Sequence, residues 1–192
     1  MANEISEILK ILIENQAEKF SIRKLSKLRE INYKSAYNSI MALEKQGLAK
    51  LERIGNTTLC SFNQKFNPLV FSVEYERREK ILKDKNIKGI FTRLKEIKIP
   101  YIAILFGSYA KGTANKHSDI DILFITQDEG KENEIKGILR LIPLNIHLTI
   151  VSYKDFIIMA KNKEFSVVSE SIKKNIILIG IEEYYRLLEN TK

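Results

Sequence analysis

Apolar residues in the N-terminal third of the chain first follow helical spacing and then form extended runs. The expected elements are three helices over residues 4–15, 22–30 and 34–46, followed by two strands over residues 48–54 and 57–62. Ser21 is expected to cap the second helix. The inward face of that helix is expected to hold Ile22, Leu25 and Leu28. Gly55-Asn56 separates the two extended runs, which predicts a β-hairpin.

The pattern changes after Pro68. Residues 69–98 predict one or two charged helices, with a break near Asn86 to Gly89, and Pro100 ends this region. Short apolar runs then alternate with amphipathic segments. They predict strands over residues 101–106, 119–126, 144–151 and 176–179, and helices over residues 132–141, 154–161 and 182–188. The fold class expected for the whole chain is therefore α+β, with a mixed sheet in the second part.

Domain bounds follow from these changes of pattern. Residues 1–66 are expected to form a small domain of helices and a hairpin. Residues 67–86 are expected to be a helical connector, and residues 87–192 an α/β domain.

Composition narrows the class of partner. The formal net charge is +8, which favours an anionic partner such as nucleic acid or a nucleotide, although a generally lysine-rich proteome would give the same excess. Cys60 is the only cysteine, so no intrachain disulfide can form. No apolar run is long enough to span a bilayer. The expectation is a soluble cytoplasmic protein with no membrane partner.

The N-terminal segment resembles a winged helix-turn-helix. The resemblance rests on the order of three helices and a hairpin, and on the segments Ser35-Ala36-Tyr37-Asn38-Ser39-Ile40 and Leu43-Glu44-Lys45-Gln46-Gly47-Leu48. It implies DNA binding, in which the third helix enters the major groove. The candidate DNA-binding residues are Lys27, Lys34, Ser35, Tyr37, Asn38 and Arg53. A winged helix that binds protein through a solvated charged face is the alternative. Because DNA-reading winged helices commonly act as pairs, a homodimer is a further expectation.

Two short motifs flank a loop in the second part of the chain. An apolar strand runs into Gly107-Ser108, where glycine permits a tight turn and serine can offer a hydroxyl and an N–H group to a phosphate. After ten residues, 109–118, comes Asp119-Ile120-Asp121. Residues i and i+2 of a strand share a face, so the two carboxylates are expected to lie side by side. A divalent cation such as Mg²⁺ would relieve their repulsion.

This segment resembles the nucleotidyltransferase superfamily related to DNA polymerase beta, in particular its minimal nucleotidyltransferase branch. The shared pattern is Gly-Ser, ten residues and Asp-x-Asp, and Lys111-Gly112 stands where many members have Arg-Gly. The resemblance covers roughly residues 87–190. It implies that Gly107, Ser108 and Lys111 bind the nucleotide, and that Asp119 and Asp121 hold Mg²⁺. Ser108 and the two aspartates are the catalytic candidates.

The family's third carboxylate has no obvious counterpart. The strand expected to carry it, residues 142–149, contains no Asp or Glu. Asn145 and His147 share a face there and occupy the third-acid position. His147 is a candidate to accept a proton or bind metal, and a packed strand histidine is the alternative.

Two functions are compatible with these patterns. The first is Mg²⁺-dependent transfer of AMP from ATP to a hydroxyl of a protein or another acceptor. In the branch it resembles, such domains often pair with HEPN-type proteins in toxin–antitoxin modules. The second is a winged-helix transcriptional regulator, whose nucleotidyltransferase domain binds nucleotide without turnover. The missing third acid favours the second function, and the intact Gly-Ser and Asp-x-Asp motifs favour the first.

Overall fold

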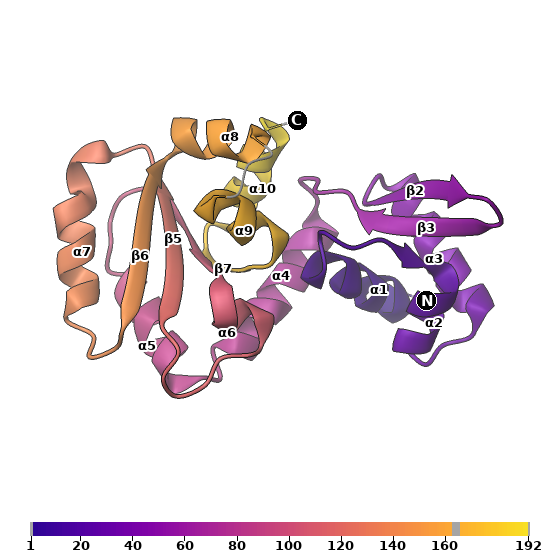
Figure 1. Cartoon of the computed structure of the whole chain (residues 1–192), viewed down its shortest axis with the longest axis horizontal. Helices are drawn as coiled ribbons and strands as arrows, with labels where there is room; N and C mark the ends of the chain where they lie inside the picture. The colour runs from indigo at the N-terminus through magenta and orange to yellow at the C-terminus, as the bar shows by residue number, and fades with distance from the viewer. Residues whose placement is uncertain (1, 163–165, 192) are drawn as a thin grey trace. The chain divides into compact units, whose positions relative to one another are not determined.

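The computed structural model describes residues 2–162 and 166–191, apart from the side chains of Ala2 and Glu129. The chain forms two compact units, residues 1–73 and 74–192 (Figure 1). The division falls within helix α4, Pro68–Ile81. Each unit has its own sheet and its own core, and each is described by itself.

The first unit has the predicted three helices and hairpin. Its elements are α1 (Ala2–Glu14), β1 (Phe20–Ser21), α2 (Ile22–Leu28), α3 (Tyr33–Lys45), β2 (Ala49–Ile54) and β3 (Thr57–Phe62). The three strands pair antiparallel in the order β1-β3-β2. Its core is formed by the apolar faces of the helices and by the sheet, including Leu12, Leu25, Ile40, Leu43 and Cys60.

Local hydrogen bonds set the helix starts in this unit. The Ser21 hydroxyl accepts a bond from the Lys24 N–H at 3.1 Å and caps α2 as predicted, and Asn32 caps α3 in the same way through the Ser35 N–H. Gly55 has φ +57° at the hairpin turn. The inward placement of Leu28 is wrong, because this side chain is 52% exposed. Leu28 is the last residue of α2, where the helix no longer presents an inward face.

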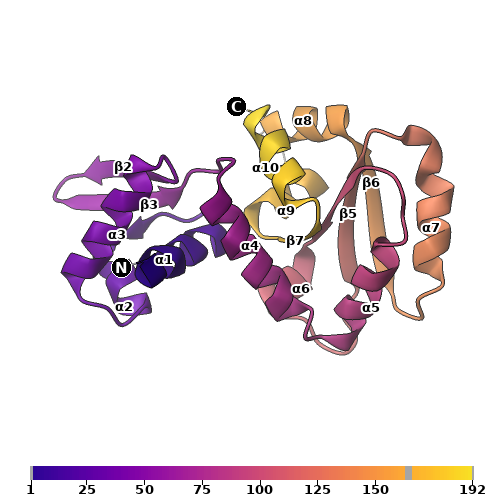
Figure 2. The ribbon, with the colours of Figure 1, turned by 180° about the vertical axis from the view of Figure 1, so that it is seen from behind.

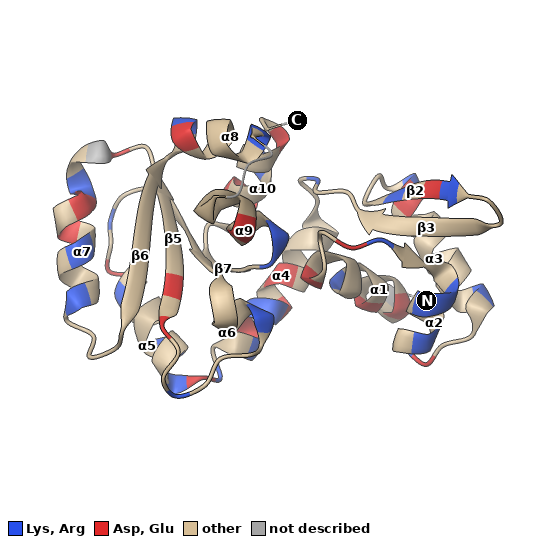
Figure 3. Cartoon of the chain, in the orientation of Figure 1, with Lys and Arg blue, Asp and Glu red and all other residues tan. Residues whose placement is uncertain are grey.

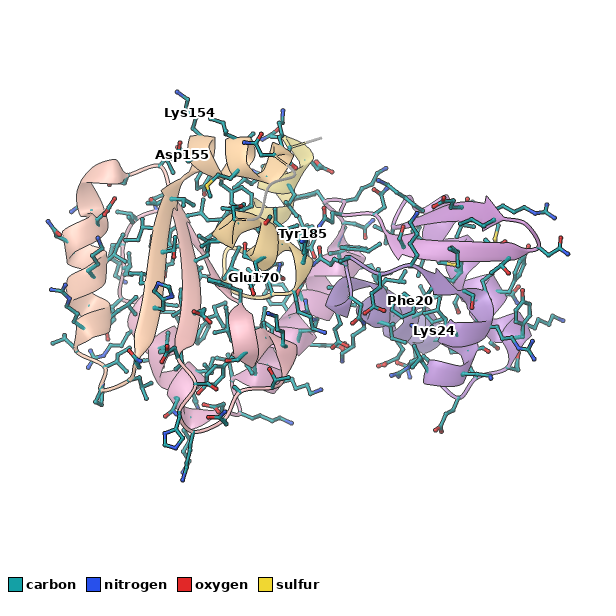
Figure 4. All side chains as sticks on the ribbon, viewed as in Figure 1. Phe20, Lys24, Lys154, Asp155, Glu170 and Tyr185 are labelled. Atoms are coloured by element: carbon teal, nitrogen blue, oxygen red, sulfur yellow. The ribbon has the colours of Figure 1, made fainter. Side chains whose placement is uncertain are left out.

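The structure adds β1, a strand of only two residues that is too short to show an alternating pattern. It pairs Phe20 with Cys60 and Ser21 with Leu59. The ammonium of Lys24 lies 4.5 Å from the centre of the Phe20 ring (Figure 4). These contacts join the start of α2 to the sheet.

The second unit is built around a four-stranded mixed sheet. Besides the end of α4, its elements are α5 (Lys85–Leu94), β4 (Tyr101–Leu105), α6 (Gly107–Lys111), β5 (Ile120–Thr126), η1 (Glu129–Lys131), α7 (Glu132–Arg140), β6 (Ile146–Ser152), α8 (Tyr153–Lys161), α9 (Val167–Lys173), β7 (Ile176–Ile179) and α10 (Ile181–Glu189). The strand order is β6-β5-β4-β7, in which β5 and β6 run parallel and the other pairs are antiparallel. The predicted fold class, α+β with a mixed sheet, is confirmed.

Helices cover both faces of this sheet. Ile120, Ile122 and Phe124 of β5 share a core cluster with apolar side chains of α5 and α7. Helices α8 and α9 contact β5, and α10 contacts β4. In Figure 1, α9 lies in front of the sheet and α8 runs across its upper end. Helix α5 lies in front of the sheet in the reverse view of Figure 2. Because strand residues alternate, Asp121 and Leu123 lie on the face away from the α5 and α7 cluster.

Two local expectations in this unit are corrected. The break between the charged helices lies at residues 82–84, not at Asn86 to Gly89, because the Asp84 carboxylate accepts hydrogen bonds from the N–H groups of Asn86 and Ile87 and starts α5 there. Gly89 lies inside α5. Helices α6 and α9 were not predicted, since α6 has five residues and α9 seven, too few for helical periodicity to show by itself; α2 is as short as α9 and was predicted with the help of its Ser21 cap.

Among the residues that the structure describes, no helix has both the length and the apolar composition needed to cross a membrane.

Cys60 is expected to resist modification in the folded protein. It is fully buried in the first unit, and burial raises the pKa of its thiol to about 11, with a smaller contribution from Glu44. The thiolate is the reactive form, so both access and ionisation oppose reaction. A colorimetric disulfide reagent at pH 8 should react with Cys60 only after urea is added. Rapid labelling of the native protein would contradict this packing.

Candidate functional site

The turn after β4 brings the backbone against an acidic side chain. Gly107 follows β4 by two residues and has φ +64°, a conformation that favours glycine. A Cβ atom at this position would lie 2.0 Å from Oδ2 of Asp121. The N–H of Phe106 donates to the backbone oxygen of Asp121 at 3.1 Å, which fixes the turn beside β5. Glycine is therefore required at Gly107 for Asp121 to keep its place.

Two carboxylates lie at the start of β5, where Figure 3 shows acidic colour on the strand. Asp119 comes directly before the strand and Asp121 is its second residue, so the strand begins one residue later than predicted. Asp121 is half-buried, with 24% of its side chain exposed, and Asp119 is exposed. Ile120 between them is buried in the core cluster. This alternation places both carboxylates on one face, as the sequence predicts.

The neighbouring strand supplies a polar partner for each carboxylate. Strand β6 runs parallel to β5, with His147 opposite Asp121. The Asn145 amide donates to Oδ1 of Asp119 at 2.5 Å, and Nδ1 of His147 lies 3.3 Å from Oδ1 of Asp121. Both candidates for the third-acid position therefore adjoin the aspartates. The alternative of a packed strand histidine does not fit, because 71% of the His147 side chain is exposed.

A metal ion at this site would be coordinated by few protein ligands. Within residues 2–162 and 166–191, no three His, Cys, Asp or Glu side chains gather as a metal-binding group. Magnesium commonly takes one or two carboxylates and completes its shell with phosphate oxygens and water. Asp119 and Asp121, on one face beside a turn with no side chain, fit that donor set. The residues present suit a magnesium ion that binds together with a phosphate ligand.

The loop that follows the turn carries the other predicted nucleotide ligands. Ser108 is half-buried in α6, and its carbonyl accepts a bond from the Thr113 N–H at 3.0 Å. Lys111 ends α6, and Gly112 caps it with φ +72°. The ammonium of Lys111 lies 2.8 Å from Oε1 of Glu170 on α9, a residue that sequence analysis did not single out (Figure 4).

A local signal for α9 exists in the sequence. Ser166 and Ser169 form a reciprocal capping box, which marks a helix start and would have placed Glu170 in its first turn. The long-range contact with Lys111 has no such local signal, since the two residues lie 59 positions apart.

Removing the Glu170 charge is expected to tighten nucleotide binding. The carboxylate holds Lys111 and partly neutralises it, so Glu170→Gln should leave the ammonium free for phosphate. Partly exposed pairs are worth up to about 1 kcal/mol, which corresponds to about a twofold to fivefold gain in ATP affinity. Titration calorimetry with a non-hydrolysable ATP analogue and Mg²⁺ measures this change in affinity. Glu96→Gln, which breaks the exposed Arg93–Glu96 pair, is the matched control and should change nothing. Weaker binding by Glu170→Gln would show that Glu170 helps to bind the nucleotide.

The six candidate DNA-binding residues lie on three elements of the first unit. Lys34, Ser35, Tyr37 and Asn38 belong to α3, Lys27 to α2 and Arg53 to β2. All are exposed except the half-buried Ser35. Tyr33, which was not singled out, stacks on Tyr37 with 6.5 Å between the ring centres, and both rings are largely exposed.

A comparison with known protein families gives a match in the second part of the chain. A family model described as "Nucleotidyltransferase domain" matches residues 85–179, from the first residue of α5 to the last of β7. The match supports a nucleotidyltransferase domain in this segment and nucleotidyl transfer in general terms. It includes the Gly107 turn, both aspartates, β6 and Glu170.

No curated protein sequence matches the chain significantly. Among solved structures, similarity is found to TrmBL2, described as an archaeal chromatin protein with a novel mode of DNA binding. The identity is 14%, the TM-score is 0.28, and the match covers 80% of this chain and 66% of that chain. This chain thus spans slightly less than two thirds of TrmBL2, and a likeness at this level carries no functional argument.

Proposed function

We propose that the second unit is a magnesium-dependent nucleotidyltransferase that moves AMP from ATP to a hydroxyl group of a protein or another acceptor. The observation that supports this most strongly is the fit between Gly107 and Asp121, because the turn keeps clear the space that the carboxylate occupies. Asp119 lies on the same face. A structural turn alone would not need two adjacent carboxylates at this position.

The transfer forms one bond and breaks another. The acceptor oxygen attacks the α-phosphorus of ATP, the bond from that phosphorus to the bridging oxygen breaks, pyrophosphate leaves, and the hydroxyl proton passes to water. Ser108 offers its hydroxyl and N–H to the phosphates, and Lys111 offers its ammonium once it parts from Glu170. When bound at Asp119 and Asp121, magnesium supplies positive charge against the charge on the phosphoryl group.

In the proposed enzyme, Asn145 and His147, at the start of strand β6 beside the two aspartates, stand in place of a third carboxylate. Neither is a carboxylate, and each contacts one of the two aspartates. We infer that they orient Asp119 and Asp121 and that turnover is slow. The resemblance to the minimal branch further suggests a HEPN-type protein as acceptor, as in a toxin–antitoxin pair.

Label transfer tests the enzyme. The full chain is incubated with Mg²⁺ and ATP labelled at the α-phosphate, with and without a co-purified partner. We expect label on protein, and none when ATP is labelled at the γ-phosphate. Asp119→Ala/Asp121→Ala should abolish transfer. Asp155→Ala should not, because this exposed carboxylate lies at the start of α8 and is hydrogen-bonded to Ser152 (Figure 4). Tight ATP binding without transfer under any metal or partner would rule the enzyme out.

A regulator is the second candidate, in which the first unit binds DNA and the second binds nucleotide without turnover. The distribution of ion pairs in the first unit favours DNA binding. Glu7, Glu18 and Glu52 form ion pairs with Arg29, Lys24 and Lys19. In the described part of the chain, no carboxylate pairs with Lys27, Lys34 or Arg53, so their charges remain available for phosphates.

Gel shifts at several salt concentrations test DNA binding. Lys27→Ala/Lys34→Ala should weaken binding and reduce its salt dependence, because two phosphate contacts are lost. Lys83→Ala/Lys88→Ala, on the second unit, removes the same charge as a control. Equal affinity of the parent chain and both double variants for DNA would rule out the proposed DNA-binding face.

A further inference from the structure

Strand β6 is an edge of the sheet in the second unit, with nothing paired to its outer side among the described strands. Its parallel pairing with β5 decides which backbone groups point outward. The Ile120 N–H bonds to the carbonyl of Asn145, and the register pairs Asp121 with His147. In this ladder Asn145, His147 and Thr149 direct their backbone groups to β5. The N–H and C=O groups of Ile146, Leu148 and Ile150 therefore face away from the sheet.

A groove of about 430 Å³ runs beside the first half of this edge. It is lined by the start of β6, by apolar side chains such as Leu144, and by Lys136 and Arg140 of α7. Two cations and no carboxylate line it. Lys136 is paired with Glu132 on the same helix at 3.0 Å, whereas Arg140 has no carboxylate partner among the described residues, so Arg140 supplies most of the available charge. Figure 1 shows α7 beside β6, and Figure 3 shows basic residues along that helix. The groove thus combines free backbone groups with positive charge.

We propose that this edge binds an extended peptide with acidic residues, which adds to the sheet as a strand beside β6 and presents a hydroxyl side chain to Asp119 and Asp121. This identifies the acceptor class and rests on the proposed transferase function. Exposed edge strands pair readily with other chains, and an added strand gains affinity from backbone bonds and specificity from side-chain pockets.

The register relates this edge to the carboxylates. Neighbouring strands are about 4.8 Å apart, so an added strand lies about 10 Å from β5. His147 pairs with Asp121 and lies between β5 and the added strand. Its side chain is exposed, so this face of the sheet is accessible. A long hydroxyl side chain such as tyrosine, on the same face and opposite His147, extends toward the aspartates.

The positive charge of the groove and the free backbone groups of β6 together favour an acidic peptide over a second copy of the chain and over nucleic acid. Pairing of β6 with β6 of a second copy would satisfy the backbone groups, but the facing edge would be another basic groove and would offer Arg140 no acidic partner. Nucleic acid would satisfy the cations but would leave the row of backbone groups along β6 without strand pairing. An acidic peptide satisfies both features.

Amide hydrogen exchange followed by NMR tests the surface without ATP. The probes are two pools of peptides about nine residues long, with a central Tyr, Ser or Thr and either glutamates or lysines in the flanks. The glutamate pool should slow exchange of the Ile146, Leu148 and Ile150 amides by about tenfold or more. The lysine pool should not.

A charge exchange sharpens the test. Lys136→Glu/Arg140→Glu should lose the response to the glutamate pool and gain one to the lysine pool. Lys83→Glu/Lys88→Glu, on exposed positions outside the groove, should behave like the parent chain.

The proposal would be overturned by no protection by either pool, by equal protection by both pools, or by protection that rises with protein concentration alone and so reveals a second copy. The same changes on adding a thymidine oligonucleotide in place of peptide would assign the groove to nucleic acid. Because exchange needs no turnover, a failed label-transfer assay with intact peptide binding would remove the proposed function and the role of the peptide as acceptor, and would leave only the peptide-binding edge. Transfer without edge protection would remove only this inference.

Discussion

Gly107→Ala is expected to remove nucleotide-dependent activity almost completely, by about a hundredfold or more, because displacement of a catalytic group by an ångström has effects of this size. The added Cβ would lie 2.0 Å from Oδ2 and 3.0 Å from Cγ of Asp121. Such a contact forces the carboxylate or the turn to move. Alanine also disfavours φ +64°, which costs about 1–2 kcal/mol of folding stability.

Gly112→Ala separates these two effects. Gly112 has φ +72°, and a Cβ there would meet nothing within 4 Å. It should therefore show the backbone cost without displacing Asp121, and should keep magnesium-dependent ATP binding and label transfer. Urea unfolding measures the stability of both variants, and calorimetry with the ATP analogue measures their site. Equal loss of ATP binding in both variants would show that the contact with Asp121 is unimportant.

The positions of the candidate site residues could be predicted because they depend on strand geometry alone. Alternation places Asp119 and Asp121 on one face, and the same rule places Asn145 and His147 on one face of the next strand. The structure brings these two pairs into contact. What these residues do remains a prediction, since geometry shows where they lie and not what they bind.

Contacts between distant segments could not be predicted. Lys111 is predicted to bind nucleotide, and its pair with Glu170 depends on how α9 packs against the sheet. Helix α4 is a stronger case. Its charged sequence predicted a helix but not burial of the charged side chains, yet Glu74 is fully buried and Arg77 is 5% exposed. Burial of charge depends on partners from elsewhere in the fold, which local spacing does not reveal.

Those partners form a buried network in the second unit. Arg77 donates to Oε2 of Glu74 at 2.6 Å and to the backbone oxygen of Asn175 at 2.5 Å. The Tyr185 hydroxyl donates to Oε1 of Glu74 at 2.7 Å, and Figure 4 labels this tyrosine. Burial, and then the adjacent Glu74 carboxylate, raise the pKa of Tyr185 well above its ordinary value, so the phenol stays a donor. The network links α4 and α10 with the residue that precedes β7.

Arg77→Met is expected to lower the free energy of unfolding by about 3–5 kcal/mol, because it leaves the buried Glu74 carboxylate without its cation. Urea unfolding followed by circular dichroism measures the change. Arg93→Met is the matched control, since Arg93 and Glu96 have the same i, i+3 spacing but are roughly half exposed. It should cost no more than about 1 kcal/mol.

A double variant separates the loss of the pair from the loss of packing. Glu74→Gln/Arg77→Met removes both charges and leaves a neutral acceptor for the Tyr185 hydroxyl, so it should recover most of the stability that Arg77→Met loses. If the double variant is as unstable as Arg77→Met, the bond from Arg77 to the Asn175 carbonyl is the important contact. If Arg77→Met costs no more than Arg93→Met, Glu74 has access to water in solution and the network does not stabilise the unit.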